Sequence, residues 1–251
     1  MRRNHYGKAE LIIFESRDAM GRRAAKDVAG CLRKLLATED EVNMVFAAAP
    51  SQNELLANLA VEPNIAWDKV NAFHMDEYLG LPLGDSRSFS GFLINAIFGK
   101  LPFKTINMLN GQTDAQEECA RYASLLRRHP PDIVCMGIGD NGHIAFNDPS
   151  VADFDDSELV KVVMLEESCR RQQVDDGCFR SLADVPVAAL TMTIPSLVQA
   201  KNLFCVVPGT RKAAALRAAM TGPVSESCPA SILRSHEGVR IYADAGAGDE
   251  L

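Results

Sequence analysis

Short apolar runs alternate with amphipathic stretches along almost the whole chain. Runs of strand length occur at 9–14, 42–47, 70–75, 105–109, 132–136, 159–164, 188–194, 202–207 and 239–242. Between them, apolar side chains recur at helical spacing over 16–37, 55–60, 88–98, 114–128 and 211–220. Because strand and helix alternate, the pattern predicts a Rossmann-like α/β fold, with a mainly parallel twisted sheet and helices on both of its faces.

The same pattern contains no break between domains. No Ser/Gly/Pro-rich linker, low-complexity tract or repeat interrupts it, so residues 1–251 are expected to form a single domain with frayed ends at 1–8 and 244–251. The least regular segment, 150–181, is rich in acidic residues. It is interpreted either as a mobile flap over a site or as a plain surface excursion.

The run 132–136 is the segment around which a site is expected. It is short, unbroken and apolar, which is typical of a strand buried on both faces. Gly137, Gly139 and Gly142 follow it and let the backbone turn sharply and approach a ligand closely. In a parallel sheet, ligands bind at the carboxyl ends of such strands. The polar residues that emerge there are Asp140, Asn141, His143, Asn147 and Asp148.

The histidine of this loop is a candidate acid and base. A carboxylate nearby can hold His143 in one tautomer, so that the ring exchanges protons near neutral pH. The alternative is that His143 is structural, which is the commoner role of a single histidine.

Three further places put polar groups where strands end or helices begin. Asp76 and Glu77 follow the run 70–75, and Ser51 and Gln52 lie at a helix start, where free N–H groups favour an anion, although ordinary capping is the alternative. Cations come from Arg170 and from the segment Thr210–Arg211–Lys212. One end of such a site would move protons and the other would hold an anion, which fits a sugar phosphate.

Composition narrows the classes of partner. A net charge of −7 argues against nucleic-acid or anionic-membrane binding, and no apolar stretch is long enough for a signal peptide or a membrane span, so a cytoplasmic protein is predicted. The seven cysteines form no C-x-x-C pair and several lie inside apolar runs, so neither a disulfide framework nor a zinc site is indicated. Whether the chain forms a homo-oligomer is left open.

Four segments together resemble the glucosamine-6-phosphate deaminase (isomerase) family. Residues 137–149, Gly-Ile-Gly-Asp-Asn-Gly-His-Ile-Ala-Phe-Asn-Asp-Pro, are similar to its signature, and Phe73-His-Met-Asp-Glu-Tyr78 to a second hallmark. Residues 189–194 and 209–216 resemble its later strand and its phosphate-binding helix. The resemblance implies a Rossmann-like fold that converts an amino-sugar 6-phosphate to a ketose 6-phosphate with release of ammonia, without a metal or redox cofactor.

The resemblance also implies roles for individual residues. His143 would open the sugar ring, oriented by Asp148, and Asp76 would move the C2 proton to C1. The phosphate would lie on Arg170, Lys212 and donors near Ser51, Gln52 and Thr210. Asn141 and Asp140 would assist ring opening, and Glu77, Gly139, Gly142 and Asn147 would contact substrate or support these groups.

The chain also departs from the family pattern. Family members carry Asp where Asn141 stands and Glu where Asp148 stands, and Ala47–Asn53 replaces a glycine-rich phosphate loop. Leu159 replaces a basic residue of the allosteric pocket. Two rival functions are weighed against deamination. A 6-phosphogluconolactonase would typically have Arg at Tyr78, and a non-catalytic sugar-phosphate sensor would bind without turnover.

Overall fold

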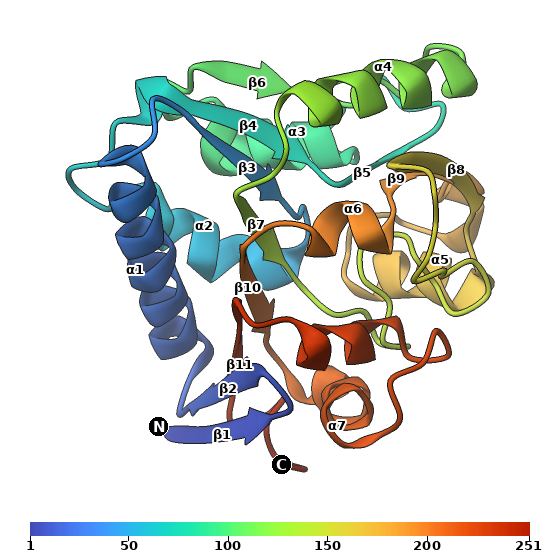
Figure 1. Ribbon diagram of the computed structural model, residues 1–251. Coiled ribbons are helices and arrows are strands. Elements are labelled where there is room, and N and C mark those ends of the chain that lie inside the picture. Colours follow the sequence, from blue (N-terminus) through green and yellow to red (C-terminus); the bar gives the residue numbers. More distant parts are fainter.

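An eight-stranded sheet forms the centre of the computed structural model, which describes residues 1–251. All neighbouring strands are parallel except the first two along the chain, which are antiparallel. The predicted mainly parallel α/β architecture is therefore confirmed (Figure 1). The strand order is β1 (Arg2–Tyr6), β2 (Ala9–Phe14), β11 (Val239–Asp244), β10 (Asn202–Val207), β7 (Ile133–Met136), β3 (Val42–Phe46), β4 (Val70–His74) and β6 (Thr105–Asn107).

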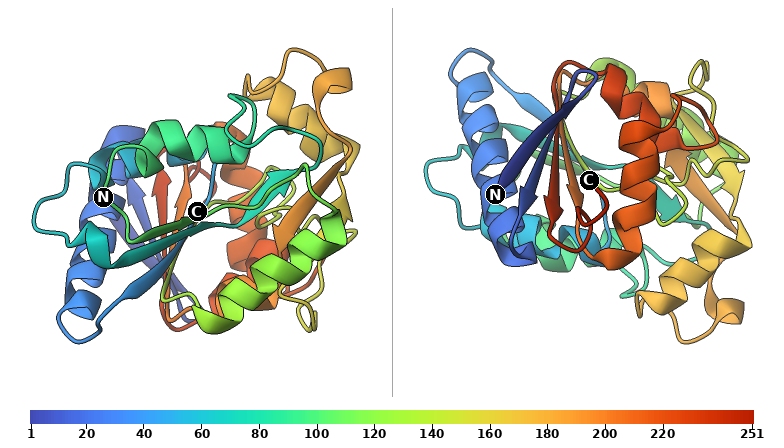
Figure 2. Two further views of the ribbon diagram at one scale, coloured as in Figure 1. Left: turned by 90° about the horizontal axis from the view of Figure 1, so that it is seen from above. Right: turned by 90° about the horizontal axis from the view of Figure 1, so that it is seen from below.

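Side chains alternate between two apolar layers along each central strand. In β7, Ile133 and Cys135 join one core cluster, and Val134 and Met136 join the other, so all four are fully buried as a two-faced strand requires. Helices cover both layers, with α1 and α7 on opposite sides of the sheet (Figure 2). The first cluster takes in α1 (Arg17–Leu36), α2 (Asn53–Leu59) and α3 (Phe89–Leu93), and the second α4 (Ala115–Arg128), α6 (Ile194–Val198) and α7 (Ala213–Thr221).

A second sheet lies beside the first and was not predicted. It has the order β5 (Asp76–Tyr78), β9 (Ala188–Met192) and β8 (Val160–Met164), and both pairings are antiparallel. The runs 159–164 and 188–194 are strands as expected, but they belong to this small sheet and not to the parallel one. The chain passes from β4 into β5 through Met75 alone, so Asp76 lies where the two sheets meet.

The two ends of the chain are more ordered than the sequence suggests. Residues 2–6 form β1, and its Arg2 side chain donates hydrogen bonds to the carbonyl oxygens of Gly248 and Leu251, at 3.1 and 2.9 Å. Ala247 is fully buried. The expectation of frayed ends at 1–8 and 244–251 is therefore wrong, because the ends pack on each other.

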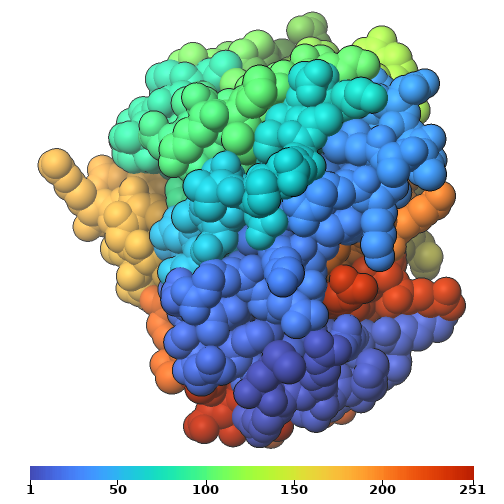
Figure 3. Space-filling view, turned by 90° about the vertical axis from the view of Figure 1, so that its left-hand side faces the viewer, coloured from blue at the N-terminus to red at the C-terminus, as the bar shows by residue number.

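The segment 150–181 contains two regular elements. These are β8 and the helix α5 (Glu167–Asp175), whose surroundings form the amber projection in the space-filling view (Figure 3). Of the 24 residues lining the main cavity, this segment supplies Gln172, Gln173 and Asp176. It therefore reaches the site described below. No helix of the protein combines the length and the apolar character needed to span a bilayer.

Candidate active site

A cavity of about 320 Å³ opens at the carboxyl ends of four neighbouring strands. The segments after β10, β7, β3 and β4 line it. Between β3 and β7 the chain order reverses, because β4 and β6 extend the sheet on one side of β3 while β10 and β11 extend it beyond β7. A crevice at such a reversal is the usual ligand site of an open α/β sheet.

Two glycines shape the loop that follows β7. A Cβ atom at Gly139 would lie 2.1 Å from the ring of His143, so only glycine allows the backbone to pass against that ring. Gly142 has φ +85°, and a Cβ atom there would lie 2.9 Å from the Cys228 sulfur. The loop is closed by a hydrogen bond from the Gly139 N–H to the His143 carbonyl, at 2.9 Å. The glycines thus fix the position of the histidine.

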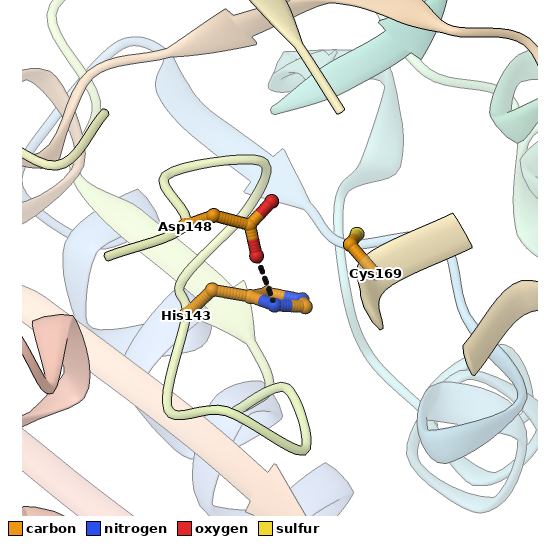
Figure 4. A group of neighbouring side chains, drawn as sticks. All are labelled: His143, Asp148 and Cys169. Atoms are coloured by element: carbon orange, nitrogen blue, oxygen red, sulfur yellow. Dashed lines mark ion pairs between the residues drawn. The ribbon is translucent and has the colours of Figure 1, made fainter. Parts of the chain in front are cut away.

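His143, Asn141 and Asp148 form one hydrogen-bonded group. Nδ1 of His143 lies 2.7 Å from Oδ1 of Asn141 and 3.1 Å from Oδ1 of Asp148, and the Asn141 amide donates to the same Asp148 oxygen at 2.8 Å (Figure 4). Both neighbours of Nδ1 are acceptors, so Nδ1 carries the proton of the neutral ring. Nε2 is then left with a lone pair that can take a proton from a ligand.

The electrostatics of this group favour an ionised Asp148. The residue is 1% exposed, and burial opposes its charge, but the His143 and Asn141 hydrogen bonds outweigh burial and keep the pKa of Asp148 below its usual range. His143 lines the cavity, whereas Asp148 and Asn141 stand behind it. From this position both residues can orient the ring without touching a ligand, and the Asp148 carboxylate can stabilise a positive charge on it.

Asp76 places a second titratable group in the same cavity. It begins β5 and lines the cavity wall, and no hydrogen bond from the protein contributes to the state of its carboxylate. Burial, and then the charge of Glu77, raise the pKa of Asp76 well above its ordinary value. A carboxylate made more basic in this way is a suitable general base.

Glu77 is a structural acceptor and does not line the cavity. Its carboxylate accepts the N–H groups of Tyr78, Phe89 and Ser90 at 2.9, 3.1 and 2.8 Å, which ties β5 to the start of α3. Asn147 has a similar supporting position, since its amide donates to the carbonyls of Ile144 and Met192, both at 2.9 Å. Both residues therefore support the site from behind.

The opposite end of the cavity carries cations and unpaired polar groups. Nζ of Lys212 lies 2.6 Å from Oδ1 of Asp140, so Asp140 contacts the cation and not the histidine. Ser51, Gln52 and Thr210 line the same wall, and Oε1 of the fully buried Gln52 has no hydrogen-bond partner. The hydroxyls of Ser51 and Thr210 can donate hydrogen bonds to a polar ligand beside the lysine, and Oε1 of Gln52 can accept one from it.

The structure does not bring Arg170 to this cavity. Its guanidinium donates to the carbonyl oxygens of Leu182 and Val185, at 2.6 and 2.9 Å, and so ties α5 to the segment that follows. The neighbouring Arg171 pairs with Glu167 on the surface. The expectation that Arg170 clamps an anion in the site is therefore not supported, because its side chain is used within the segment 167–185.

Other residues of the cavity were not expected from the sequence. Arg17, at the start of α1, lines the wall while its side chain pairs with Glu54 at 2.7 Å. Arg211, which belongs to the expected cationic segment 210–212, also lines the wall and pairs with Asp176, which follows α5 and was not expected. In the sequence, Arg17 and Asp18 look like the ordinary start of a helix. No local pattern connects Arg17 to cavity residues that are 30 or more positions away. Phe89, Gln172 and Gln173 also line the cavity and were not expected, whereas Ala145 and Phe146 lie within the signature segment 137–149.

Comparison with known proteins places the chain among sugar-phosphate enzymes. The family described as glucosamine-6-phosphate isomerases/6-phosphogluconolactonase matches residues 15–242. A glucosamine-6-phosphate deaminase from Listeria welshimeri is 38% identical over 243 residues, which covers 96% of this chain and 100% of the relative. One from Bacillus cereus is 34% identical over 217 residues, covering 86% and 80%.

Solved structures share the fold. A structure described as a monomeric glucosamine-6-phosphate deaminase superposes with a TM-score of 0.88 at 27% identity, covering 96% of this chain and 99% of that one. The 6-phosphogluconolactonase of Trypanosoma brucei gives a TM-score of 0.81 at 15% identity, with both chains fully covered. The second likeness concerns the fold alone.

Proposed function

The chain belongs to the glucosamine-6-phosphate isomerase and 6-phosphogluconolactonase family, and on this basis we propose that it isomerises and deaminates an amino-sugar 6-phosphate. The products would be a ketose 6-phosphate and ammonia. The observation that carries the proposal is that Asp76, His143 and Lys212 line one cavity. Its volume of about 320 Å³ is at the small end of ligand pockets and suits a phosphorylated monosaccharide.

The phosphate is assigned to the end of the cavity at Lys212. The lysine ammonium, the Arg211 guanidinium and the unpaired N–H groups at the start of the helical turn Thr210–Lys212 can hold a dianion together. Asp140 and Asp176 already pair with these cations, so the phosphate must share or displace them. On the same wall, the Ser51 hydroxyl is assigned as a donor to a phosphate oxygen, and the free Oε1 of Gln52, which can only accept, is assigned to a sugar hydroxyl.

Ring opening is assigned to His143. With its proton on Nδ1, the ring accepts the C1 hydroxyl proton at Nε2 and returns a proton to the ring oxygen. The imidazolium that forms in between is stabilised by the Asp148 carboxylate, which lies 3.1 Å from Nδ1. Asn141 supplies no charge, but it holds both partners in place through two hydrogen bonds.

Proton transfer between C2 and C1 is assigned to Asp76. Its raised pKa makes the carboxylate a stronger base than an ordinary aspartate, and the ammonium on C2 acidifies the proton it removes. Removal of the C2 proton gives an enolamine, delivery of that proton to C1 converts the enolamine to an iminium at C2, and hydrolysis of the iminium releases ammonia. The reaction so written needs only side chains of this cavity and water.

An ammonia-release assay with purified protein tests the proposal. Glucosamine 6-phosphate and its galacto epimer are supplied in parallel, because the C4 hydroxyl is the group whose partners distinguish them. Release of one ammonia per ketose phosphate from either substrate supports deamination. Hydrolysis of 6-phosphogluconolactone without ammonia from either amino sugar would assign the protein to the other branch of the family, and binding without turnover would indicate a sensor.

A further inference from the structure

Three side chains beside the cavity place metal-ligand atoms close together. A nitrogen of His143, a carboxylate oxygen of Asp148 and the sulfur of Cys169 all lie within 4.8 Å of one another. They come from the loop after β7 and from α5 (Figure 4). Tetrahedral Zn²⁺, with bonds of about 2.0–2.3 Å to N, O and S, needs its ligand atoms roughly 3.5 Å apart. The three atoms can reach that spacing through small side-chain movements.

Two features of the cluster are not explained by the proposed reaction. Oδ2 of Asp148 is buried and receives no N–H or O–H donor, and the Cys169 thiol is the further group close enough to donate a weak hydrogen bond to this carboxylate. Cys169 is 1% exposed, and its side chain projects from α5 toward the catalytic group although the mechanism above gives it no part. A buried carboxylate that lies beside a thiol and an imidazole is a suitable donor set for a borderline-soft cation.

We propose that His143, Asp148 and Cys169 form an inhibitory site for a thiophilic divalent cation of the Zn²⁺ class. Cys169 supplies the selectivity, because magnesium and calcium prefer oxygen ligands. The fourth position belongs to water or to Oδ1 of Asn141, which already lies 2.7 Å from Nδ1 of the histidine. One thiolate and one carboxylate balance the two positive charges, so the buried site is neutral when filled.

Metal binding at this place removes the base that ring opening needs. The cation takes the lone pair of Nδ1, so the ring proton moves to Nε2, and the Cys169 thiol releases its proton to solvent. Nothing is oxidised or reduced. Nε2 then carries a proton and can no longer accept one from the sugar hydroxyl. The cation therefore blocks turnover while the phosphate end of the cavity stays free.

Cobalt(II) provides a readout that does not depend on turnover. It substitutes for zinc in N/O/S sites, and a bound thiolate adds an intense near-ultraviolet charge-transfer band. We expect this band on titration of the full-length wild-type protein with Co²⁺, and its loss when Zn²⁺ displaces the cobalt. Cys169→Ala should lack the band and should need at least tenfold more Zn²⁺ to halve its own metal-free activity, since even outer-shell changes cost 10–100-fold in metal affinity.

Cys178→Ala is the matched control. Cys178 follows α5 in the same segment but is not part of the cluster, so this variant should keep both the band and the zinc sensitivity. Cys169→Ser removes the thiolate with the smallest change in volume and covers the case in which the alanine variant folds poorly. A cobalt band that persists in Cys169→Ser, or a wild-type protein that gives no band, would overturn the proposal. Both results are independent of whether the protein deaminates amino sugars.

Discussion

Replacement of Asp148 by asparagine isolates the contribution of one charge to ring opening. An amide at this position can keep both hydrogen bonds, because Oδ1 of Asp148 accepts from Asn141 at 2.8 Å and from His143 at 3.1 Å, while Oδ2 has no partner. The amide nitrogen would take the place of Oδ2. Asp148→Asn therefore removes the negative charge and leaves the shape of the group almost unchanged.

The size of the effect follows from the kind of hydrogen bond that is lost. A bond to a charged group is worth about 1.5–3 kcal/mol and a neutral one about 0.5–1.5 kcal/mol. The charge therefore contributes roughly 1–2 kcal/mol when the His143 ring becomes positive, which corresponds to about a 5- to 30-fold loss of kcat/KM. Full Coulomb attraction at 3.1 Å, about 5 kcal/mol at an effective dielectric constant of ~20, is an upper bound.

The assay compares substrates that carry hydrogen or deuterium at C2. Slower ring opening makes the C2 step less rate-limiting, so the isotope effect on kcat/KM should be smaller in Asp148→Asn than in the wild type. Asp155→Asn, an exposed acid on the same segment, is the control and should leave both quantities unchanged. Activity within twofold of the wild type, or a larger isotope effect, would refute the role assigned to Asp148.

Four other variants test the remaining parts of the site. Asp76→Asn should reduce kcat by at least a thousandfold while the calorimetric Kd for substrate stays within threefold; loss of binding would contradict a role in proton transfer alone. Protonation of Asp76 removes the base, so kcat/KM should fall as the pH drops through the raised pKa of Asp76. Glu77→Gln removes a charge that raises this pKa, so the decrease in kcat/KM should move to lower pH. An unchanged pH profile would count against the influence of Glu77 on Asp76. Lys212→Met should raise KM at least tenfold, and equal KM values would exclude Lys212 from the phosphate site. Arg170→Met, by contrast, should leave KM unchanged and lower Tm by about 2–10 °C, because two hydrogen bonds to backbone carbonyls are lost; a raised KM with normal Tm would restore Arg170 to the site.

The parallel sheet and its central strand could be predicted because their signals are local. An unbroken apolar run followed by glycines marks β7, and His143 from the loop after it lines the cavity. The small antiparallel sheet could not be predicted in the same way. Its strands β8 and β9 have ordinary apolar runs, and only their partners, including the three-residue β5, reveal that they leave the main sheet.

The local sequence also does not show which arginine side chains face the cavity. Arg170 and Arg17 are both arginines at helical positions, and the sequence contains nothing local to tell which faces the cavity. Long-range contacts decide it, because Arg170 finds the carbonyls of Leu182 and Val185, whereas Arg17 lies over the loop after β3. Residues on strand ends are thus easier to assign than flexible cations on helices, since a strand end fixes the direction of its side chains.

The most direct test of the account follows the hydrogen at C1 of the product. The reaction is run in D₂O on glucosamine 6-phosphate and its galacto epimer, and the ketose phosphate and ammonia are measured together by NMR. The account predicts equal amounts of ammonia and ketose phosphate. It also predicts that any deuterium, which enters when the proton held by Asp76 exchanges with solvent before delivery, lies at one of the two C1 positions only, because Asp76 delivers the hydrogen from one side. Absence of ammonia, or deuterium spread over both positions, would contradict the assignment of one cavity carboxylate to this transfer.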